Sequence, residues 1–106
     1  MIYNQNTSSF KGIEFAVFKL KDGVTEEKLI QLSKKMDDDF LKNQNELLAH
    51  FLLKGTENRY ADVAIATTQE KAEEYCSQWL ENNIALQYLE LINTDSVNMT
   101  FWSRIT

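Results

Sequence analysis

The sequence predicts an α+β domain in which four antiparallel strands form one sheet and two main helices cover one face of it. Three observations support this fold class. Six amphipathic segments follow one another as strand, helix, strand, strand, helix, strand, and nearly every strand is rich in apolar residues on both faces. The 106 residues also include no proline and only three glycines, which leaves little room for long irregular loops.

The first strand is expected over residues 12–21, where side chains alternate with the period of two that a strand requires. A turn that contains glycine ends it. Thr25 then suits the N-cap of a helix, and the carboxylates of Glu26 and Glu27 complement the helix dipole in the first turn. Apolar residues at helical spacing extend this helix over residues 26–42.

The second and third strands, residues 46–54 and 60–67, are separated by a five-residue connection that is compatible with a hairpin. If this connection sets the register, His50 lies opposite Ala64, with Asp62 one diagonal away. The hairpin therefore brings the only histidine of the chain near a carboxylate.

The second helix is expected to begin at a capping box over residues 67–70 and to end at Asn82-Asn83. A short turn or helix follows over 84–92, and the last strand, 96–105, alternates again. The inward stripe of the second helix is expected to consist of Ala72, Cys76, Trp79 and Leu80.

Strand–helix–strand, taken twice with right-handed crossovers, gives an antiparallel sheet of order 4-1-3-2, the ferredoxin-like βαββαβ plait. Alternation leads us to expect a helix-facing side made of Ile13, Phe15, Val17, Leu47, Ala49, Phe51, Val63, Ile65, Val97, Met99 and Phe101. The other side is expected to carry Ala16, Phe18, Leu20, Leu48, Leu52, Ala64 and Trp102. That second side has too much apolar area to face water, so we expect a second copy of the chain to cover it in a homodimer.

Composition and charge exclude several classes of function. The hydrophobic fraction of 43% and the charged fraction of 25% are ordinary for a soluble globular domain. The net charge of −5 and the lack of a basic cluster make nucleic acid and anionic membranes poor partners. No apolar run approaches the length of a membrane span, the first nine residues do not read as a signal peptide, and the lone Cys76 favours a reducing compartment. We therefore expect a cytoplasmic protein with a loose N-terminal arm over residues 1–11 and a single domain over 12–106.

Residues 12–105 resemble a known superfamily through four groups of residues: Phe40-Leu41, Tyr60-x-Asp62-Val63, Glu70-x-Ala72 and Tyr88-x-x-Leu91-Ile92-x-x-x-Ser96-Val97-x-Met99. With them the chain looks like the dimeric α+β barrel superfamily, in particular its antibiotic-biosynthesis-monooxygenase-like members. The resemblance implies a homodimer whose two sheets close into a barrel with the helices outside. It also implies a cofactor-independent monooxygenase-like activity on a small aromatic or apolar molecule. Haem degradation is disfavoured, because the haem-degrading members use a histidine on a helix and the only histidine here is on a strand.

His50 is the candidate catalytic residue. On the alternation above it shares the dimer-facing side with Glu14, Tyr60, Asp62, Trp102 and Arg104. A histidine oriented by a carboxylate can act as a general base on a phenol or enol. The alternative is that His50 only hydrogen-bonds across the dimer or faces solvent at an edge. Asp62 and Arg104 are expected to form an ion pair across the interface or to anchor a ligand carboxylate.

Aromatic residues on the helices suggest a second place for a ligand. A cavity between helices and sheet could be lined by Met36, Phe40, Tyr75 and Trp79, although aromatic residues at helical spacing are also typical of a plain core. The leading hypothesis is thus an enzyme with His50 as base and with Tyr60, Trp79 or Trp102 in the pocket wall. The alternative is a non-catalytic dimeric module that binds a small ligand or has a structural role.

Neither a metal site nor a cofactor is expected. The carboxylates of Asp37-Asp38-Asp39 fan out by about 100° per residue on a helix, so they read as a solvated helix end rather than as ligands of one ion. Cys76 is expected to be an inert core thiol. The sequence contains no glycine-rich phosphate loop and no zinc-ligand spacing.

Overall fold

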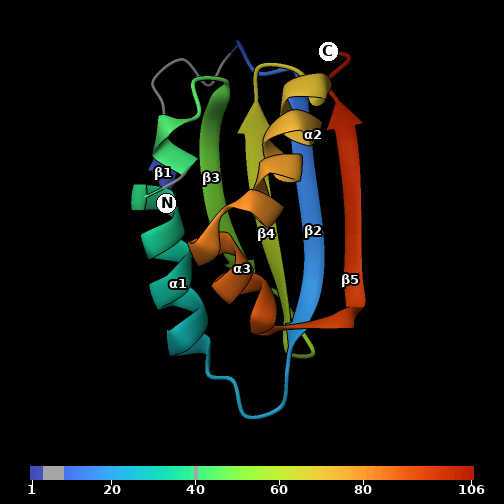
Figure 1. Ribbon diagram of the computed structural model, residues 1–106. Helices are drawn as coiled ribbons and strands as arrows, with labels where there is room; N and C mark the ends of the chain where they lie inside the picture. The colour runs from blue at the N-terminus through green and yellow to red at the C-terminus, as the bar shows by residue number, and fades with distance from the viewer. Residues whose placement is uncertain (4–8, 40) are drawn as a thin grey trace.

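One antiparallel sheet with helices on a single face organises the computed structural model, which describes residues 1–3, 9–39 and 41–106 (Figure 1). The sheet runs in the order β1-β3-β4-β2-β5. Its strands are β1 (Ile2–Tyr3), β2 (Gly12–Leu20), β3 (Leu47–Lys54), β4 (Arg59–Ala66) and β5 (Ile92–Ser103). The four long strands keep the order 4-1-3-2, so the predicted ferredoxin-like plait is confirmed.

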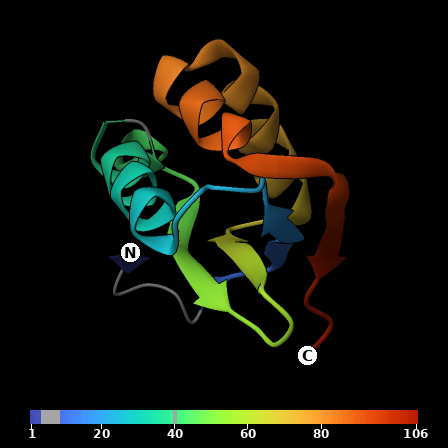
Figure 2. The ribbon, with the colours of Figure 1, turned by 90° about the horizontal axis from the view of Figure 1, so that it is seen from below.

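The helices form a second layer over this sheet. They are α1 (Glu26–Asp39), α2 (Gln69–Ser77) and α3 (Asn83–Glu90), with the short 3-10 helices η2 (Leu41–Asn43) and η3 (Gln78–Glu81). Helix α1 lies on the β3 side, α2 lies over β2, and α3 lies between α1 and α2 (Figure 1). Seen from below, all these helices stand on one side of the sheet and the opposite side is uncovered (Figure 2).

The ends of the helices follow local chemistry. The Thr25 hydroxyl accepts a hydrogen bond from the Lys28 backbone N–H at 3.2 Å, as expected of an N-cap. For α2 the cap is one residue later than the predicted capping box, because Thr68 caps Lys71 while the Thr67 hydroxyl donates to a glutamate on the loop before β3. A Cβ atom on Gly12 would lie 2.2 Å from the Thr68 carbonyl carbon. Glycine at this position therefore allows the N-terminus of α2 to pack directly against β2.

The predicted register of the β3–β4 hairpin is confirmed, with His50 opposite Ala64. Asn82 ends η3 and caps α3, its side-chain oxygen accepting from two backbone N–H groups of the first turn. The short helix expected after the second main helix is therefore α3. Strand β5 begins at Ile92, earlier than predicted, because Ile92 pairs with Leu20 beyond an irregularity in the β2–β5 register.

The predicted faces of β2, β3 and β4 are wrong, except at Leu47. Glu14 pairs with Ala64 and Phe101, and its face is the one covered by helices. The helix-facing side carries Glu14, Ala16, Phe18, Leu47, His50, Leu52, Tyr60, Asp62, Ala64, Val97, Met99 and Phe101. The expectation failed because both faces are apolar, so alternation alone cannot say which one is covered. His50 and Asp62, expected on the outer side, bind each other beneath the helices, and Glu14 binds Tyr75 there.

The uncovered side is apolar, as predicted, but different residues form it. We call it the open face: Ile13, Phe15, Val17, Phe51, Leu53, Val63, Ile65 and Trp102. Trp102, which is 59% exposed, is the residue that the sequence placed correctly on this side. Phe18, Leu48 and Ala64, expected there, are buried within the chain.

The start of the chain is tied to the sheet edge, since Ile2 pairs with His50 and Tyr3 with Ala49. Of the predicted N-terminal arm, residues 4–8 lie outside the described residues. In the described part of the chain, no helix combines the length and the apolar character needed to cross a membrane.

Candidate active site

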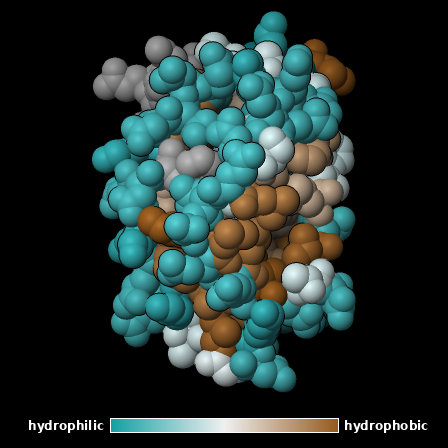
Figure 3. Space-filling model, in the orientation of Figure 1, coloured by the Kyte–Doolittle hydropathy of each residue, from teal (hydrophilic) through white to brown (hydrophobic). Residues whose placement is uncertain are grey.

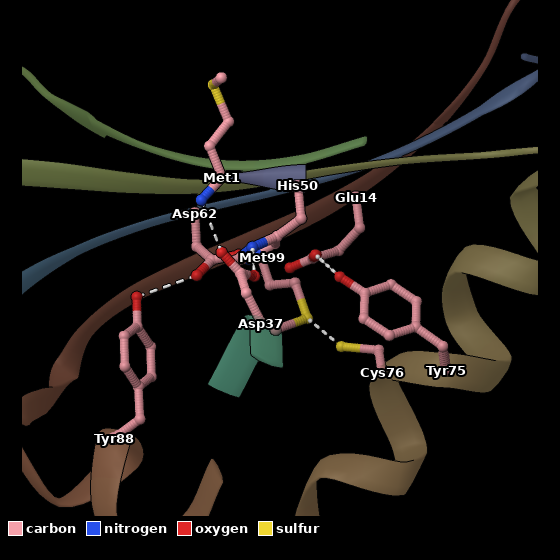
Figure 4. A network of polar contacts seen from close by, with 9 residues as sticks. All are labelled: Met1, Glu14, Asp37, His50, Asp62, Tyr75, Cys76, Tyr88 and Met99. Carbon is pink, nitrogen blue, oxygen red and sulfur yellow. Dashed lines mark hydrogen bonds and ion pairs between the residues drawn. The ribbon is translucent and has the colours of Figure 1, made fainter. Parts of the chain in front are cut away.

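A line of buried charged side chains crosses the layer between α1 and the sheet (Figure 4). His50 on β3 contacts Asp37 of α1 through Nδ1 at 2.6 Å and Asp62 of β4 through Nε2 at 2.7 Å. The second oxygen of Asp37 accepts from the amino group of Met1 at 2.8 Å, and that of Asp62 accepts from the Tyr88 hydroxyl at 2.9 Å. Each carboxylate therefore binds through both of its oxygens.

The charge of His50 follows from these partners. The imidazole is completely buried, and burial alone would lower its pKa, but the carboxylates of Asp62 and Asp37 raise the pKa to about 10. Burial would raise the pKa of Asp37, yet His50 and the amino group of Met1 hold it below its ordinary value. At neutral pH this is an imidazolium whose two N–H groups both donate to carboxylates.

The position of the predicted site differs from the one that the sequence suggested. His50 and Asp62 do lie together, but under the helices and not at the dimer-facing side. Asp62 binds His50 and Tyr88, whereas the Arg104 guanidinium lies 4.6 Å from the centre of the Phe10 ring. An Asp62 buried beneath the helices cannot pair with Arg104 across an interface on the open face.

Two other predicted site residues lie elsewhere. The Tyr60 hydroxyl donates to Glu26 of α1 at 3.0 Å. The Trp102 indole N–H donates to Thr100 at 2.8 Å on the open side of the sheet. Neither residue lines a common pocket with His50 among the described cavities.

Glu14, on the neighbouring strand β2, is the second buried acid of the helix-facing side. Its side chain is only 3% exposed and accepts a hydrogen bond from the Tyr75 hydroxyl of α2 at 3.1 Å (Figure 4). Burial, and then the charge of Asp62, raise its pKa to about 7, although Tyr75 and His50 act in the opposite direction. Its other oxygen has no hydrogen-bond partner among the described residues.

Glu14 lies at a pocket of about 180 Å³ between the sheet, α2 and α3. Apart from Glu14 and Asp62 its lining is mainly apolar or aromatic: Ala16, Phe18, Cys76, Trp79, Leu80, Tyr88, Leu89, Ile92, Val97 and Met99. Figure 3 shows the corresponding apolar patch where α2 and α3 meet β5. Because a cavity of about 150 Å³ can bind benzene, the pocket has room for one aromatic ring or a compact two-ring molecule.

The cavity that the sequence suggested beside Trp79 is thus present, with a different lining. Trp79 forms part of its wall, Tyr75 contacts its acid, and Met36 is buried in the core away from it. Phe40 lies outside the described residues. Cys76 is at the pocket rather than in the core, and burial followed by the charges of nearby acids raises its pKa to about 12, which keeps it a neutral thiol.

Sequence reasoning placed Glu14 on the same side as His50 but did not count it as a site residue, and it missed the partners Asp37 and Tyr88. Asp37, expected at a solvated helix end, is buried while its two acidic neighbours are not. A usable signal was present, since Asp37 follows Ser33 and Met36 on the buried stripe of α1. Within the described ranges, no group of His, Cys, Asp and Glu side chains is arranged to hold a metal ion.

No protein-family profile and no curated protein matches this sequence. Solved structures do match. SnoaB, a cofactor-independent oxygenase from Streptomyces nogalater, has 14% identity and a TM-score of 0.69 over 91% of this chain and 95% of that chain. A dimeric ferredoxin-like protein from an uncultured marine organism has 11% identity and a TM-score of 0.64 over 96% and 94% of the two chains. A hypothetical protein of Arabidopsis thaliana has 15% identity and a TM-score of 0.68 over 92% and 90%.

At these identities the TM-scores show the fold alone. The chain shares the ferredoxin-like fold of these structures, which is the fold that the sequence predicted.

Proposed function

We propose that this protein is a cofactor-independent, oxygenase-like enzyme for a small aromatic or apolar molecule with a weakly acidic hydrogen. One observation supports the proposal above all: a carboxyl group with a pKa of about 7 and a free oxygen lies at a pocket that is otherwise mainly apolar. A general base works best when its pKa is near the working pH, and burial is a common way to bring a glutamate there.

Glu14, rather than His50, is the base in this proposal. A base needs a free lone pair, and both ring nitrogens of His50 already face carboxylates. His50 instead holds positive charge beside Asp62, which limits the repulsion that Glu14 meets from that carboxylate. It is a positioning residue, and Glu14 is the group that touches substrate.

The proposed reaction starts when Glu14 takes a proton from a C–H or O–H group that is acidified by a neighbouring ring or carbonyl. The carbanion or enolate then gives an electron to dioxygen, and recombination forms a hydroperoxide on carbon. Loss of water converts a CH2 group into a carbonyl, so that CH2 plus dioxygen becomes C=O plus water. One oxygen atom enters the product and the other leaves as water, which is monooxygenase stoichiometry. The apolar lining supports this step because an anion in a dry pocket is less stabilised and more readily oxidised.

The test uses β-tetralone, a two-ring ketone with an acidic C–H between ring and carbonyl. Without oxygen, the wild-type protein should exchange that hydrogen for deuterium, and Glu14→Gln should slow the exchange about 100- to 10,000-fold. Glu26→Gln is the matched control, because Glu26 is half-exposed and binds Lys54 away from the pocket.

Oxygen uptake by the same sample then tests the oxygenase step. Exchange that depends on Glu14 without oxygen uptake would leave a base catalyst and remove the oxygenase assignment. Saturable binding of β-tetralone with neither exchange nor uptake would favour the non-catalytic ligand-binding module.

The proposal also includes a homodimer formed through the open face. The apolar side chains of that face and the dimeric state of a ferredoxin-like structural neighbour support it. Light scattering should give twice the mass of one chain, and Phe15→Glu should give monomers. Leu80→Glu, on the helix side, is the control that should remain dimeric. A monomeric wild-type protein would contradict the dimer.

We keep the cytoplasm as the proposed location, since a lone cysteine without a disulfide partner suits a reducing compartment. Fractionation of cells that produce the protein would test it, and recovery outside the cytoplasmic fraction would contradict it.

A further inference from the structure

A second apolar surface lies on the helix side of the sheet, where α2 and η3 approach β5 (Figure 3). Its most exposed side chains are Leu80 of η3, at 71%, and Val97 and Met99 of β5, at 41% and 43%. Phe101 continues the same row, because alternate residues of a strand share a face. We call these four residues the β5 patch. The patch and the open face lie on opposite sides of the sheet, so the proposed dimer contact is a different surface (Figure 2).

The segments that form the β5 patch carry only negative charges. Residues 72–103, which include most of α2, all of η3 and α3, and β5, contain no Lys, Arg or His. Their acidic side chains are Glu73, Glu74, Glu81, Glu90 and Asp95. The rest of the chain has equal numbers of acidic and basic residues, so this stretch carries the entire net charge of −5. Charge complementarity therefore favours a partner that is apolar in the centre and positively charged around it.

Helix α2 places one of these acids at the end of the patch. The Ser103 hydroxyl donates to the Gln69 side chain, and the Cys76 thiol contacts the sulfur of Met99 at 3.7 Å, so α2 runs alongside β5. Glu73 lies four residues after Gln69 and three before Cys76, which is the spacing of one helix face. Its exposed carboxylate is thus next to the C-terminal half of β5.

The β5 patch also borders a free strand edge. β5 is the last strand in the sheet order, and in the described ranges it pairs only with β2. Its twelve residues include no Lys, Pro or Gly, the residue types that commonly protect an edge from pairing. Asp95, two residues before Val97, is the only charged residue of the strand. From Asp95 to Ser103, β5 is therefore an apolar edge with an acid near each end.

We propose that the β5 patch binds an extended segment of a partner protein, which pairs with the free edge of β5 and carries apolar side chains flanked by Lys or Arg. The backbone of the edge supplies hydrogen bonds, and alternate side chains of the segment reach the helix side of the sheet. Its apolar side chains cover Val97 and Met99, and its cations face Asp95 and Glu73. Because Leu80, Val97 and Met99 are also the exposed part of the pocket lining, the bound segment covers the pocket.

The test uses synthetic peptides of nine residues with blocked ends, the length of the edge from Asp95 to Ser103. The first has Lys at both ends and Val alternating with Thr between them, so that Lys and Val project from one face. A second peptide has Glu in place of Lys, and a third has Ser in place of Val. The first should bind saturably, with chemical-shift changes on β5 and α2. The other two should bind about 10-fold more weakly or worse.

Two variants of the protein form a matched pair. Met99→Lys and Asn98→Lys introduce the same charge one residue apart, on opposite faces of β5. Both side chains are exposed, so both variants should fold. Met99→Lys places a cation in the patch and should weaken binding of the Lys peptide about 10-fold or more, whereas Asn98→Lys should change it by less than about threefold.

Backbone methylation distinguishes pairing with the edge from contact between side chains alone. The N–H groups of an extended peptide point alternately to its two edges, so methylation at the Val residues blocks one edge and methylation at the Thr residues blocks the other. Only one edge of the peptide can pair with β5. One methylated form of the Lys peptide should therefore lose binding to the wild-type protein, and the other should retain it.

Three results would overturn the proposal: no binding of the Lys peptide to the wild-type protein, equal binding of the Lys and Glu peptides, and equal behaviour of the two methylated forms. Chemical-shift changes confined to the open face would place the peptide there and would also overturn it. None of these results bears on Glu14, whose role as a base is measured by hydrogen exchange without any peptide.

Discussion

His50 and Glu14 lie on the same face of the sheet, one on β3 and the other on β2, and both are buried and ionisable. Their surroundings differ. His50 has two carboxylate partners at 2.6 and 2.7 Å, whereas Glu14 has one hydroxyl partner and a pocket beside it. Their pKa values move to about 10 and about 7, so one group is fixed in its charged form and the other is poised near neutrality.

This difference indicates which of the two buried ionisable residues is the better candidate for a catalytic role. A lone histidine attracts attention because its ordinary pKa is near neutral, but a fully satisfied histidine is a structural cation. The reactive candidate is the group that burial has perturbed and whose hydrogen bonds are incomplete. Here that group is a glutamate, a residue type that is usually dismissed as surface.

Of the substitutions that test the difference between His50 and Glu14, His50→Ala should have the largest effect on stability. Removal of the imidazolium leaves Asp37 and Asp62 buried without their shared partner, and we expect a loss of about 3–5 kcal/mol in the free energy of unfolding. Urea denaturation measures it. The combined variant Asp37→Asn, His50→Gln, Asp62→Asn has no buried charge in the network and should recover part of the loss. A cost below about 1 kcal/mol for His50→Ala would show that the network is not structural.

The second largest expected effect is the change in the free energy of unfolding with pH. The pKa of His50 is raised from 6.5 to about 10 on folding, so its stabilisation is complete below pH 6.5 and is lost as the pH rises through 10. In that window the folded state binds one more proton, and the free energy of unfolding should fall by at most about 1.4 kcal/mol per pH unit. Glu14, with its raised pKa, adds a fall of the same sign between pH 4.5 and 7.

The His50 contribution is isolated by subtracting the profile of His50→Gln, measured by denaturation at each pH. The groups that face His50 are Asp37 of α1 and Asp62 of β4. A wild-type profile parallel to that of His50→Gln from pH 6.5 to 10 would contradict the raised pKa.

Tyr75→Phe tests the surroundings of Glu14, the other residue of the comparison. It removes the hydroxyl that donates to Glu14, so the carboxylate loses a stabilising hydrogen bond and the pKa of Glu14 should rise above 7. We expect a cost of about 1 kcal/mol in stability. An NMR titration of the Glu14 carboxyl carbon measures the pKa. Tyr88→Phe, which loses its bond to Asp62 instead, is the control, and an equal rise there would argue against a specific Tyr75 contact.

The smallest effect on stability is expected for Leu80→Ala. Leu80 lines the pocket but is 71% exposed, so its truncation should change the free energy of unfolding by less than about 0.5 kcal/mol. Binding of a ring compound should nevertheless weaken, because the side chain covers the ligand. A large loss of stability with unchanged binding would place Leu80 in the core and not at the pocket.

Much of the fold could be predicted because it depends on local signals. Thr25 caps α1, the short connection after β3 sets His50 opposite Ala64, and two strand–helix–strand units with right-handed crossovers fix the strand order. Each of these follows from residues that are close in sequence or from a rule of chain handedness. The predicted cavity beside Trp79 also corresponds to the pocket, although not all of its lining was foreseen.

The candidate site could not be predicted to the same extent because its groups come from distant segments. Asp37, His50 and Asp62 lie on three elements, and only the last two are joined by a hairpin whose register the sequence suggests. Because both faces of β2 to β4 are rich in apolar residues, alternation assigned the helices to the wrong face of these strands. It thereby moved Glu14 from a buried pocket to a supposed interface.

The sequence by itself determined the plait, its strand order and the presence of an apolar sheet face that needs a cover, because periodicity and turn chemistry are local properties. Only the tertiary structure decided which face the helices take, and with it which charged groups are buried. That choice depends on whether the helices can supply partners for Glu14, His50 and Asp62. Tyr75, Asp37 and Tyr88 supply them, and buried charges are tolerated where such partners exist.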